Sequence, residues 1–231
     1  MIMSDENTPP ADDATDEKDG PGCMPAVVAG TLIMGIIAAV MCGVTTWILF
    51  QKRAEIAVRT LDGFVPVIEQ SLLEPEDKAD VVSQFKSVIK EMSAPDYPPA
   101  SASAVMQRIV RLPIPHWGEL DAVETYVEKN FEGEKQARAL TDLSRLRQAV
   151  KLNLATVLDV VDVLEPVAVI DPASGARSLK TKLTDEDIED ATKRAGLLAQ
   201  RAKIDDRRFP PITMGSILRQ EIKMAKTEGG Y

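Results

Sequence analysis

The chain has 231 residues, a formal net charge of −9 and two cysteines, and these properties exclude several classes of protein. Nucleic-acid-binding proteins concentrate Lys and Arg against phosphates, so this acidic chain predicts no nucleic-acid partner. Both cysteines, Cys23 and Cys42, lie at or within one apolar segment. The remaining chain therefore offers no thiol for a disulfide or a thiolate metal site.

Residues 1–22 form an acidic tail. It contains seven acidic residues and one lysine, and so supplies −6 of the net charge. Such a composition cannot bury enough apolar surface to fold, so we predict a disordered tail over 1–22. We predict a second flexible segment at the other end, over 227–231, where the sequence is TEGGY.

An uncharged apolar segment follows over residues 26–50. Its 25 residues would form about 37 Å of helix at about 1.5 Å per residue, more than the ~30 Å hydrocarbon layer of a bilayer. A cleaved signal peptide would have a basic leader and a shorter apolar region. We therefore predict an uncleaved single-pass transmembrane helix over 23–50, with Trp47, Lys52 and Arg53 at the membrane interface.

Basic residues near a span predict its orientation. Lys52, Arg53 and Arg59 follow the apolar segment, whereas Lys18 alone precedes it. The positive-inside rule then places the large C-terminal domain in the cytoplasm. The alternative is the frequent bacterial arrangement of a short cytoplasmic tail and an exported domain.

Small residues recur every four positions within the predicted span, at Thr31, Gly35, Ala39 and Gly43. Residues four apart lie on one face of a helix, and small side chains there allow a second helix to approach closely. We predict that this face mediates self-association or binds a partner helix. The alternative is that Gly and Ala are simply common in membrane helices.

Residues 51–73 are predicted to form a juxtamembrane helical segment. An apolar stripe supports the helix, and it consists of Phe64, Val65, Ile68 and Leu72. Gly63 and Pro66 predict a break or a kink in this segment. A break there would hinder rigid transmission of motion from the span.

Residues 74–226 are predicted to form an all-α domain, a bundle of about six helices. The strongest signal is one continuous helix over 134–165, which contains neither Gly nor Pro. Apolar residues recur there at heptad spacing, and Arg147 interrupts one of the two seams. Residues 167–170 resemble a strand but are too short to imply a sheet.

Helix caps give further boundaries in this domain. Ser101 or Ser103 is predicted to cap a short helix that ends near Leu112. Thr184 and Asp187 have the spacing of a capping box at the start of another helix. The neighbouring acidic residues are interpreted as charges at the start of that helix, because an EF-hand loop would need glycine where Asp190 stands.

The sequence contains no recognisable catalytic, cofactor-binding or metal-binding motif. His116 is the only histidine, and we interpret it as a loop residue because no second His and no Cys lies nearby in the sequence. We therefore assign no catalytic or metal residue and predict no cofactor. Two clusters of basic residues are present, and they consist of Arg177, Lys180, Lys182, Arg207 and Arg208. They could make weak contact with anionic lipid, or they could be ordinary charges in contact with solvent.

These features favour a membrane-anchored helical interaction or scaffold module with a protein partner or self-association. One alternative is an unrecognised enzyme that uses scattered carboxylates or His116, and another is a membrane-coupled sensor. A deep pocket with titratable groups would favour the enzyme, and a flat apolar patch on the long helix would favour the module.

Overall fold

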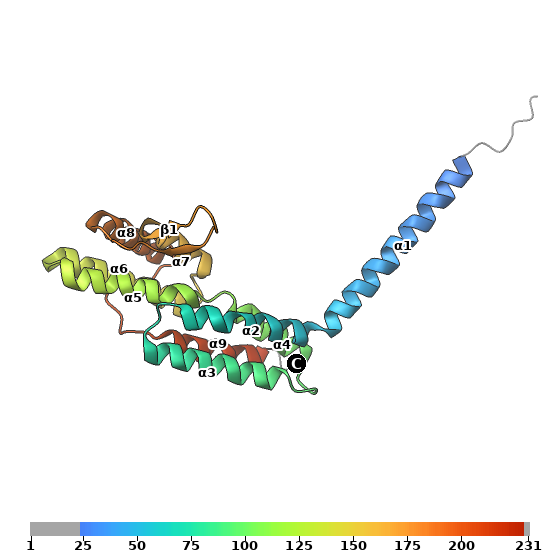
Figure 1. Cartoon of the computed structure of the whole chain (residues 1–231), viewed down its shortest axis with the longest axis horizontal. Coiled ribbons are helices and arrows are strands. Elements are labelled where there is room, and N and C mark those ends of the chain that lie inside the picture. The colour runs from blue at the N-terminus through green and yellow to red at the C-terminus, as the bar shows by residue number, and fades with distance from the viewer. Residues whose placement is uncertain (1–23, 229–231) are drawn as a thin grey trace, which may run out of the picture. The chain divides into compact units, whose positions relative to one another are not determined.

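The computed structural model describes residues 24–228, and most of these residues are helical (Figure 1). The described residues are 74% helical with little sheet, which confirms the predicted all-α class. The chain divides into two units, Met1–Ile48 and Leu49–Tyr231. The predicted disordered tail over 1–22 and the last three residues lie outside the described part of the chain.

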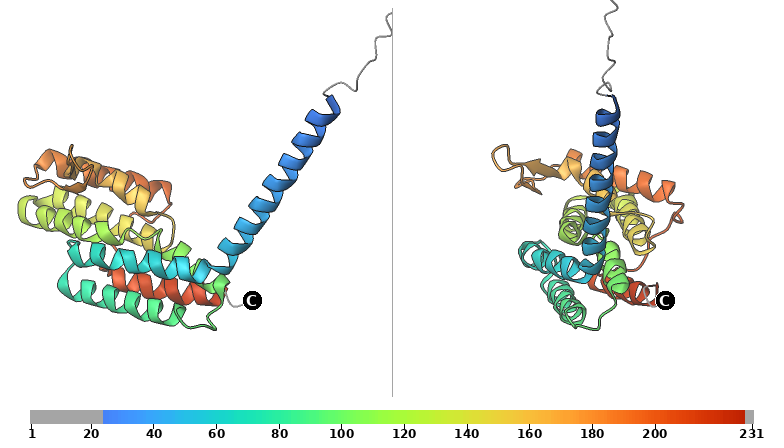
Figure 2. Two further views of the ribbon diagram at one scale, coloured as in Figure 1. Left: turned by 45° about the vertical axis from the view of Figure 1, so that its right-hand side comes forward. Right: turned by 90° about the vertical axis from the view of Figure 1, so that its right-hand side faces the viewer.

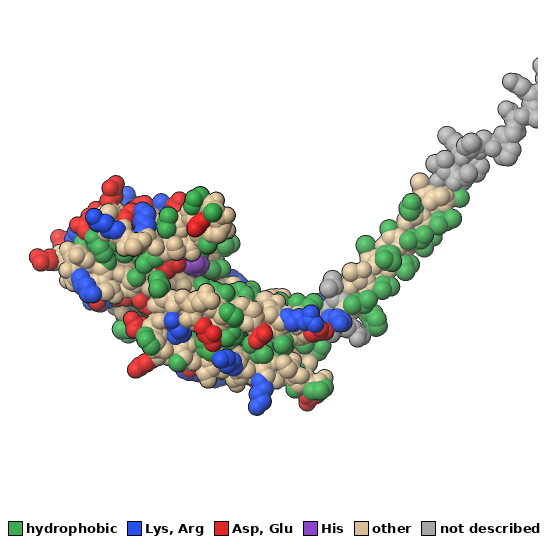
Figure 3. Space-filling view, viewed as in Figure 1, with side chains coloured by type: hydrophobic (Ala, Val, Ile, Leu, Met, Phe, Trp, Pro, Cys, Tyr) green, Lys and Arg blue, Asp and Glu red, His purple; other side chains and the backbone are tan. Residues whose placement is uncertain are grey.

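The first unit is described from residue 24 onward, as helix α1 (Met24–Gln51). Within the described residues, α1 is the one helix long and apolar enough to cross a membrane, over the 21 residues Val28–Ile48. Every residue of that stretch is exposed, and its surface is mostly hydrophobic (Figure 3). The long apolar helix is therefore confirmed.

The second unit contains eight further α-helices and one small hairpin within the described residues. The helices are α2 (Arg53–Gln70), α3 (Pro75–Met92), α4 (Pro99–Ile109), α5 (Ile114–Asn130), α6 (Gly133–Lys151), α7 (Val157–Val163), α8 (Asp185–Arg201) and α9 (Met214–Glu228). Helices α2, α3, α4 and α9 pack together as one layer, and α5 to α8 form a second layer (Figure 2). A continuous hydrophobic core, mostly aliphatic, joins the two layers.

Helix α2 runs without a break through Gly63 and Pro66, so the predicted break is wrong. Both residues lie on the exposed face. The buried residues of α2, which lie on the opposite face and pack against α3 and α4, are Ala57, Leu61, Val65 and Ile68. This packing offsets the cost of an interior proline, about 3 kcal/mol in an isolated helix. The helical run breaks instead at Lys52, between α1 and α2.

The predicted continuous helix over 134–165 is also wrong, because it divides into α6 and α7. Asn153 adopts a left-handed backbone with φ 59°. The Asn153 amide donates to the carbonyl of Val150, and the Leu154 amide donates to that of Ala149. This pattern is a Schellman motif, which ends a helix. Thr156 and Asp159 then form a capping box that starts α7.

The other helix boundaries agree with the sequence in part. The capping box of Thr184 and Asp187 is confirmed at the start of α8. Helix α4 begins at Pro99, so neither predicted serine caps it, and Ser101 is buried inside it. Helix α5 begins at Ile114, and Pro115 lies in its first turn, where proline is tolerated. His116 is therefore helical, and its interpretation as a loop residue is wrong.

The strand-like residues do form a small sheet, although the sequence predicted none. Strands β1 (Ala168–Ile170) and β2 (Arg177–Leu179) pair antiparallel, with Val169 opposite Ser178. Between them, the Asp171 carboxylate accepts hydrogen bonds from the amides of Ala173 and Ser174. The loop thus forms a turn of the Asx type that closes the hairpin.

Candidate functional site

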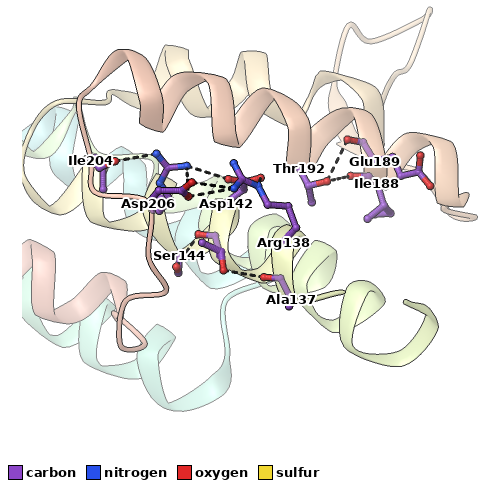
Figure 4. Close-up of polar contacts among 11 residues, drawn as sticks. Ala137, Arg138, Asp142, Ser144, Ile188, Glu189, Thr192, Ile204 and Asp206 are labelled. Atoms are coloured by element: carbon purple, nitrogen blue, oxygen red, sulfur yellow. Dashed lines mark hydrogen bonds and ion pairs between the residues drawn. The ribbon is translucent and has the colours of Figure 1, made fainter. Parts of the chain in front are cut away.

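A groove of about 710 Å³ lies between α6 and α8. The two helices approach closely because Gly196 of α8 faces Asp142 of α6, where a Cβ would come within 2.7 Å of the carboxylate carbon. The groove is lined by aromatic, aliphatic and charged residues, which include Phe131, Lys135, Arg138, Asp142, Arg145, Glu189, Lys193, Leu197 and Asp206. Figure 4 shows its polar contacts.

The groove has a buried charged floor. Asp142 is 6% exposed and Arg145 is 4% exposed. Their side chains pair, with 3.2 Å between Arg145 Nη1 and Asp142 Oδ1. Arg145 Nη2 also donates to the carbonyl of Ile204 at 2.9 Å. Buried charges need such partners, because desolvation without them is costly.

The carbonyl of Ile204 accepts this hydrogen bond because of how α8 ends. Lys203 has a left-handed backbone with φ 57°. The Lys203 amide donates to the carbonyl of Gln200, and the Ile204 amide donates to that of Ala199. This second Schellman motif turns the chain at the end of α8. It brings the segment that contains Ile204 and Asp206 against α6.

Asp206 lies over the two groove arginines from an exposed loop. Its carboxylate is 3.1 Å from Arg138 Nη1 and 3.2 Å from Arg145 Nη1. Arg138 also pairs with Asp142, at 3.0 Å. The hydrogen bond to Asp206 and the charge of Asp142 raise the pKa of the Arg138 guanidinium further above its usual value. Figure 4 shows Arg138, Asp142 and Asp206 together beside Ile204.

The rim of the groove combines charge with apolar surface. Lys135 Nζ lies 3.7 Å above the ring of Phe131 and pairs with Glu189. Leu197 of α8 is 54% exposed although its neighbours in the helix are buried. A charged rim in a lining that also contains an exposed leucine is suited to contact with a mixed apolar and polar ligand.

A second charged cluster joins the hairpin to α5. Glu119 is buried and accepts hydrogen bonds from Arg177 Nη1 at 2.6 and 2.8 Å, and His116 Nδ1 is 3.2 Å from it. Burial alone would raise the pKa of Glu119, but the hydrogen bonds from His116 and Arg177 outweigh burial and lower it. His116 does not line the groove. This cluster holds β2 against α5.

A third cluster surrounds Arg147, which is buried between α5 and α6. Its guanidinium donates to Asp121 at 2.7 Å and to Glu124. Burial raises the pKa of Asp121 to about 6, because desolvation and neighbouring carboxylates outweigh the charge of Arg147. The carboxylates that add to this effect include Glu124 and Asp77 of α3.

We expect Asp121 to make stability depend on pH. Its pKa of about 6 in the folded state exceeds the usual aspartate value of 3.8, so the folded state binds the proton first as pH falls. The free energy of unfolding should therefore rise by about 1 kcal/mol between pH 7 and pH 5 relative to Asp121→Asn. Urea unfolding in detergent, followed by the fluorescence of Trp117 in a Trp47→Phe background, measures this difference. Equal changes with pH in both chains would contradict it.

The residues predicted at the membrane all lie at or near α1. Thr31, Gly35, Ala39 and Gly43 are exposed on α1. Among the described residues, and apart from the adjacent residues and the nearby backbone of α1 itself, no atom lies within 4 Å of a Cβ built on Gly35 or Gly43. Their role in helix packing stays a prediction.

The predicted interface residues lie near the α1–α2 junction. Trp47 is 62% exposed. Lys52 is the N-cap residue of α2 and pairs with Glu55 at 3.3 Å, and Arg53 is the first residue of that helix. The location of these three residues at the membrane interface stays a prediction.

The basic residues considered for lipid contact have partners within the protein in several cases. Arg177 pairs with Glu119, Lys180 pairs with Asp187 at 2.8 Å, and the Arg207 guanidinium lies 4.7 Å from the ring of Phe209. Lys182 and Arg208 are exposed. Lipid contact at the first three would have to compete with these partners.

The acidic residues at the start of α8 do not converge on one point. Asp185 accepts from Tyr126, Asp187 pairs with Lys180, and Asp190 pairs with Arg194. Over residues 24–228, no group of three or more metal-ligating side chains is placed to hold an ion.

No protein-family model matches the chain, and no curated protein or solved structure matches it.

Sequence reasoning missed the groove. Its floor residues, Asp142 and Arg145, are buried on α6 among aliphatic residues such as Leu143 and Leu146. Charged residues within an apolar stretch were a usable signal, because buried charges require specific partners. The partner loop at 204–206 had no comparable signal in the sequence.

Proposed function

We propose that the protein is a membrane-anchored helical module that binds a partner protein in the groove between α6 and α8. The observation that carries this proposal is the groove itself, whose lining combines the buried Asp142–Arg145 pair with the exposed Leu197. Protein-binding surfaces commonly combine an apolar contact with surrounding polar groups and arginine.

The anchor in this proposal is α1. Its residues Val28–Ile48 are apolar and exposed, and soluble proteins rarely expose contiguous apolar patches above a few hundred Å². A lipid bilayer would cover these side chains and leave the helix backbone internally hydrogen-bonded. These arguments support a single-pass membrane protein.

Binding is favoured over catalysis by the chemistry of the groove. The groove does gather titratable side chains, as an active site would. Its arginines and aspartates pair with one another. Its lining includes neither His116 nor a cysteine, so it lacks the side chains that most often serve as an activated base or nucleophile.

Photo-crosslinking from the groove tests the proposed binding. We expect a photo-reactive residue at Leu197 of the full chain in native membranes to give a discrete crosslinked protein. The matched control is Glu186, which is also exposed on α8 but does not line the groove. A crosslink at neither position, or the same crosslink at both, would show that the groove is not a partner site.

We place the helical domain on the cytoplasmic side of the membrane, as Lys52, Arg53 and Arg59 predict. Glu186→Cys can report this, in a background that carries Cys23→Ser and Cys42→Ser. An impermeant maleimide should label it only after the cells are permeabilised. Labelling in intact cells would place the domain outside.

A further inference from the structure

Asp206 holds a position that an external anion would be expected to take. Its side chain is 59% exposed, on the loop between α8 and α9, yet it contacts both groove arginines. An ion pair with so exposed a member is weak, because water and salt screen it. Asp206 can therefore leave the two guanidinium groups without unfolding the core.

Arg145 has hydrogen-bonding capacity that the protein does not use. The residue is more than nine-tenths buried and lines the groove. Its Nε has no hydrogen-bond partner among the described residues. Buried polar atoms are nearly always paired, and Arg147 Nε, outside the groove lining, is unpaired in the same way. The charge and the burial of Arg145 therefore carry the argument for a ligand.

The balance of charge in the groove favours an anion. Its lining has four basic side chains, Lys135, Arg138, Arg145 and Lys193, and three acidic ones, Asp142, Glu189 and Asp206. If Asp206 left, an excess of two positive charges would remain. Arginine binds carboxylates with planar, charge-assisted hydrogen bonds.

We propose that the groove binds an acidic segment of the partner protein, and that a partner carboxylate replaces Asp206 on Arg138 and Arg145. Asp206 then acts as an internal competitor that keeps the site filled until the partner arrives. Leu197, which lines the same groove, would contact an apolar residue of the same segment. This inference rests on the proposed function and specifies the chemistry of the partner.

Synthetic peptides test the inference on the full chain in detergent micelles. One fluorescent ten-residue peptide alternates Leu with Asp and Glu, and its control replaces the acids with Asn and Gln. Anisotropy should show at least about tenfold tighter binding of the acidic peptide, because charge-assisted bonds to arginine are lost in the control. Equal binding of the two peptides would overturn the inference.

Three variants test whether the acidic peptide binds at Arg138 and Arg145 in the groove. Asp206→Asn should tighten binding of the acidic peptide by at least about fivefold because it removes the competing charge. Arg138→Gln should weaken binding by at least about tenfold, and the Arg138 side chain is 56% exposed, so the fold should tolerate it. Asp205→Asn is the control, since Asp205 pairs with Arg207 and lies outside the groove lining. No tightening by Asp206→Asn, or equal tightening by Asp205→Asn, would overturn the internal-competitor role.

Two further results separate the possible failures. If inorganic phosphate displaces the acidic peptide as strongly as an unlabelled copy of that peptide does, the site is a general anion site and the inference fails. If both peptides bind equally while the Leu197 crosslink remains, the acidic assignment fails but the proposed function stands. If a photo-reactive residue at Leu197 gives no discrete crosslinked protein in native membranes, the proposed function itself is wrong.

Discussion

Replacing both Ile36 and Val40 with arginine is expected to release the protein from membranes. Both side chains are exposed on α1, near the middle of Val28–Ile48. Each arginine at a helix centre costs about 2.5 to 3.5 kcal/mol of insertion free energy. Together they offset the roughly 3 to 7 kcal/mol that eleven Val, Leu, Ile and Phe residues over 26–50 provide.

Alkaline extraction followed by centrifugation measures this release. The native chain should sediment with membranes at its full length, since a cleaved signal would leave a shorter product. Ile36→Leu with Val40→Leu is the matched control and should stay in the pellet. Retention of the double-arginine chain as an integral protein would contradict a role for α1 as the anchor.

Gly118→Ala is expected to destabilise the helical domain strongly. Gly118 lies in α5 against the backbone between α2 and α3, and an added Cβ would collide with the carbonyl carbon of Leu72 and the amide of Leu73. Backbone atoms cannot yield as a flexible side chain can. We expect a loss of about 3 kcal/mol, which corresponds to a fall in Tm of roughly 6 to 12 °C for a domain of this size.

Gly63→Ala is the matched control for this prediction. Gly63 lies on the exposed face of α2, and among the described residues nothing is within 4 Å of the position that an added Cβ would take. Alanine should therefore stabilise α2 by about 0.5 to 1 kcal/mol through its better helix propensity. Circular dichroism against temperature compares the two variants, and an unchanged Tm for Gly118→Ala would refute the close contact between α5 and the α2–α3 loop.

The sequence predicted local features of this fold well where a local interaction decides them. The capping box of Thr184 with Asp187 needs only residues three apart. The end of α6 was also local, because Asn153 in a left-handed conformation and the Thr156 capping box lie within four residues. That end was missed because a heptad pattern continued through it.

Other features depend on contacts between distant segments, and the sequence could not predict them. Helix α2 persists through Pro66 because α3 and α4 cover its opposite face. Arg147 looked like a defect in an apolar seam, whereas Asp121 and Glu124 of α5 pair with it. The groove forms from α6, α8 and the loop of Asp206. Helical periodicity in the sequence does not predict which helices pack against each other, so it could not predict this groove.

The central claim is that one chain uses α1 to hold the α6–α8 groove at a membrane, where a partner binds. The most direct measurement compares the yield of the Leu197 crosslink in cells that express either the native anchor or the Ile36→Arg, Val40→Arg chain at equal amounts. We predict a discrete crosslinked partner with the native anchor and at least about a tenfold lower yield without it, because anchoring raises the effective concentration of the two proteins. An equal yield from the released chain would contradict the claim.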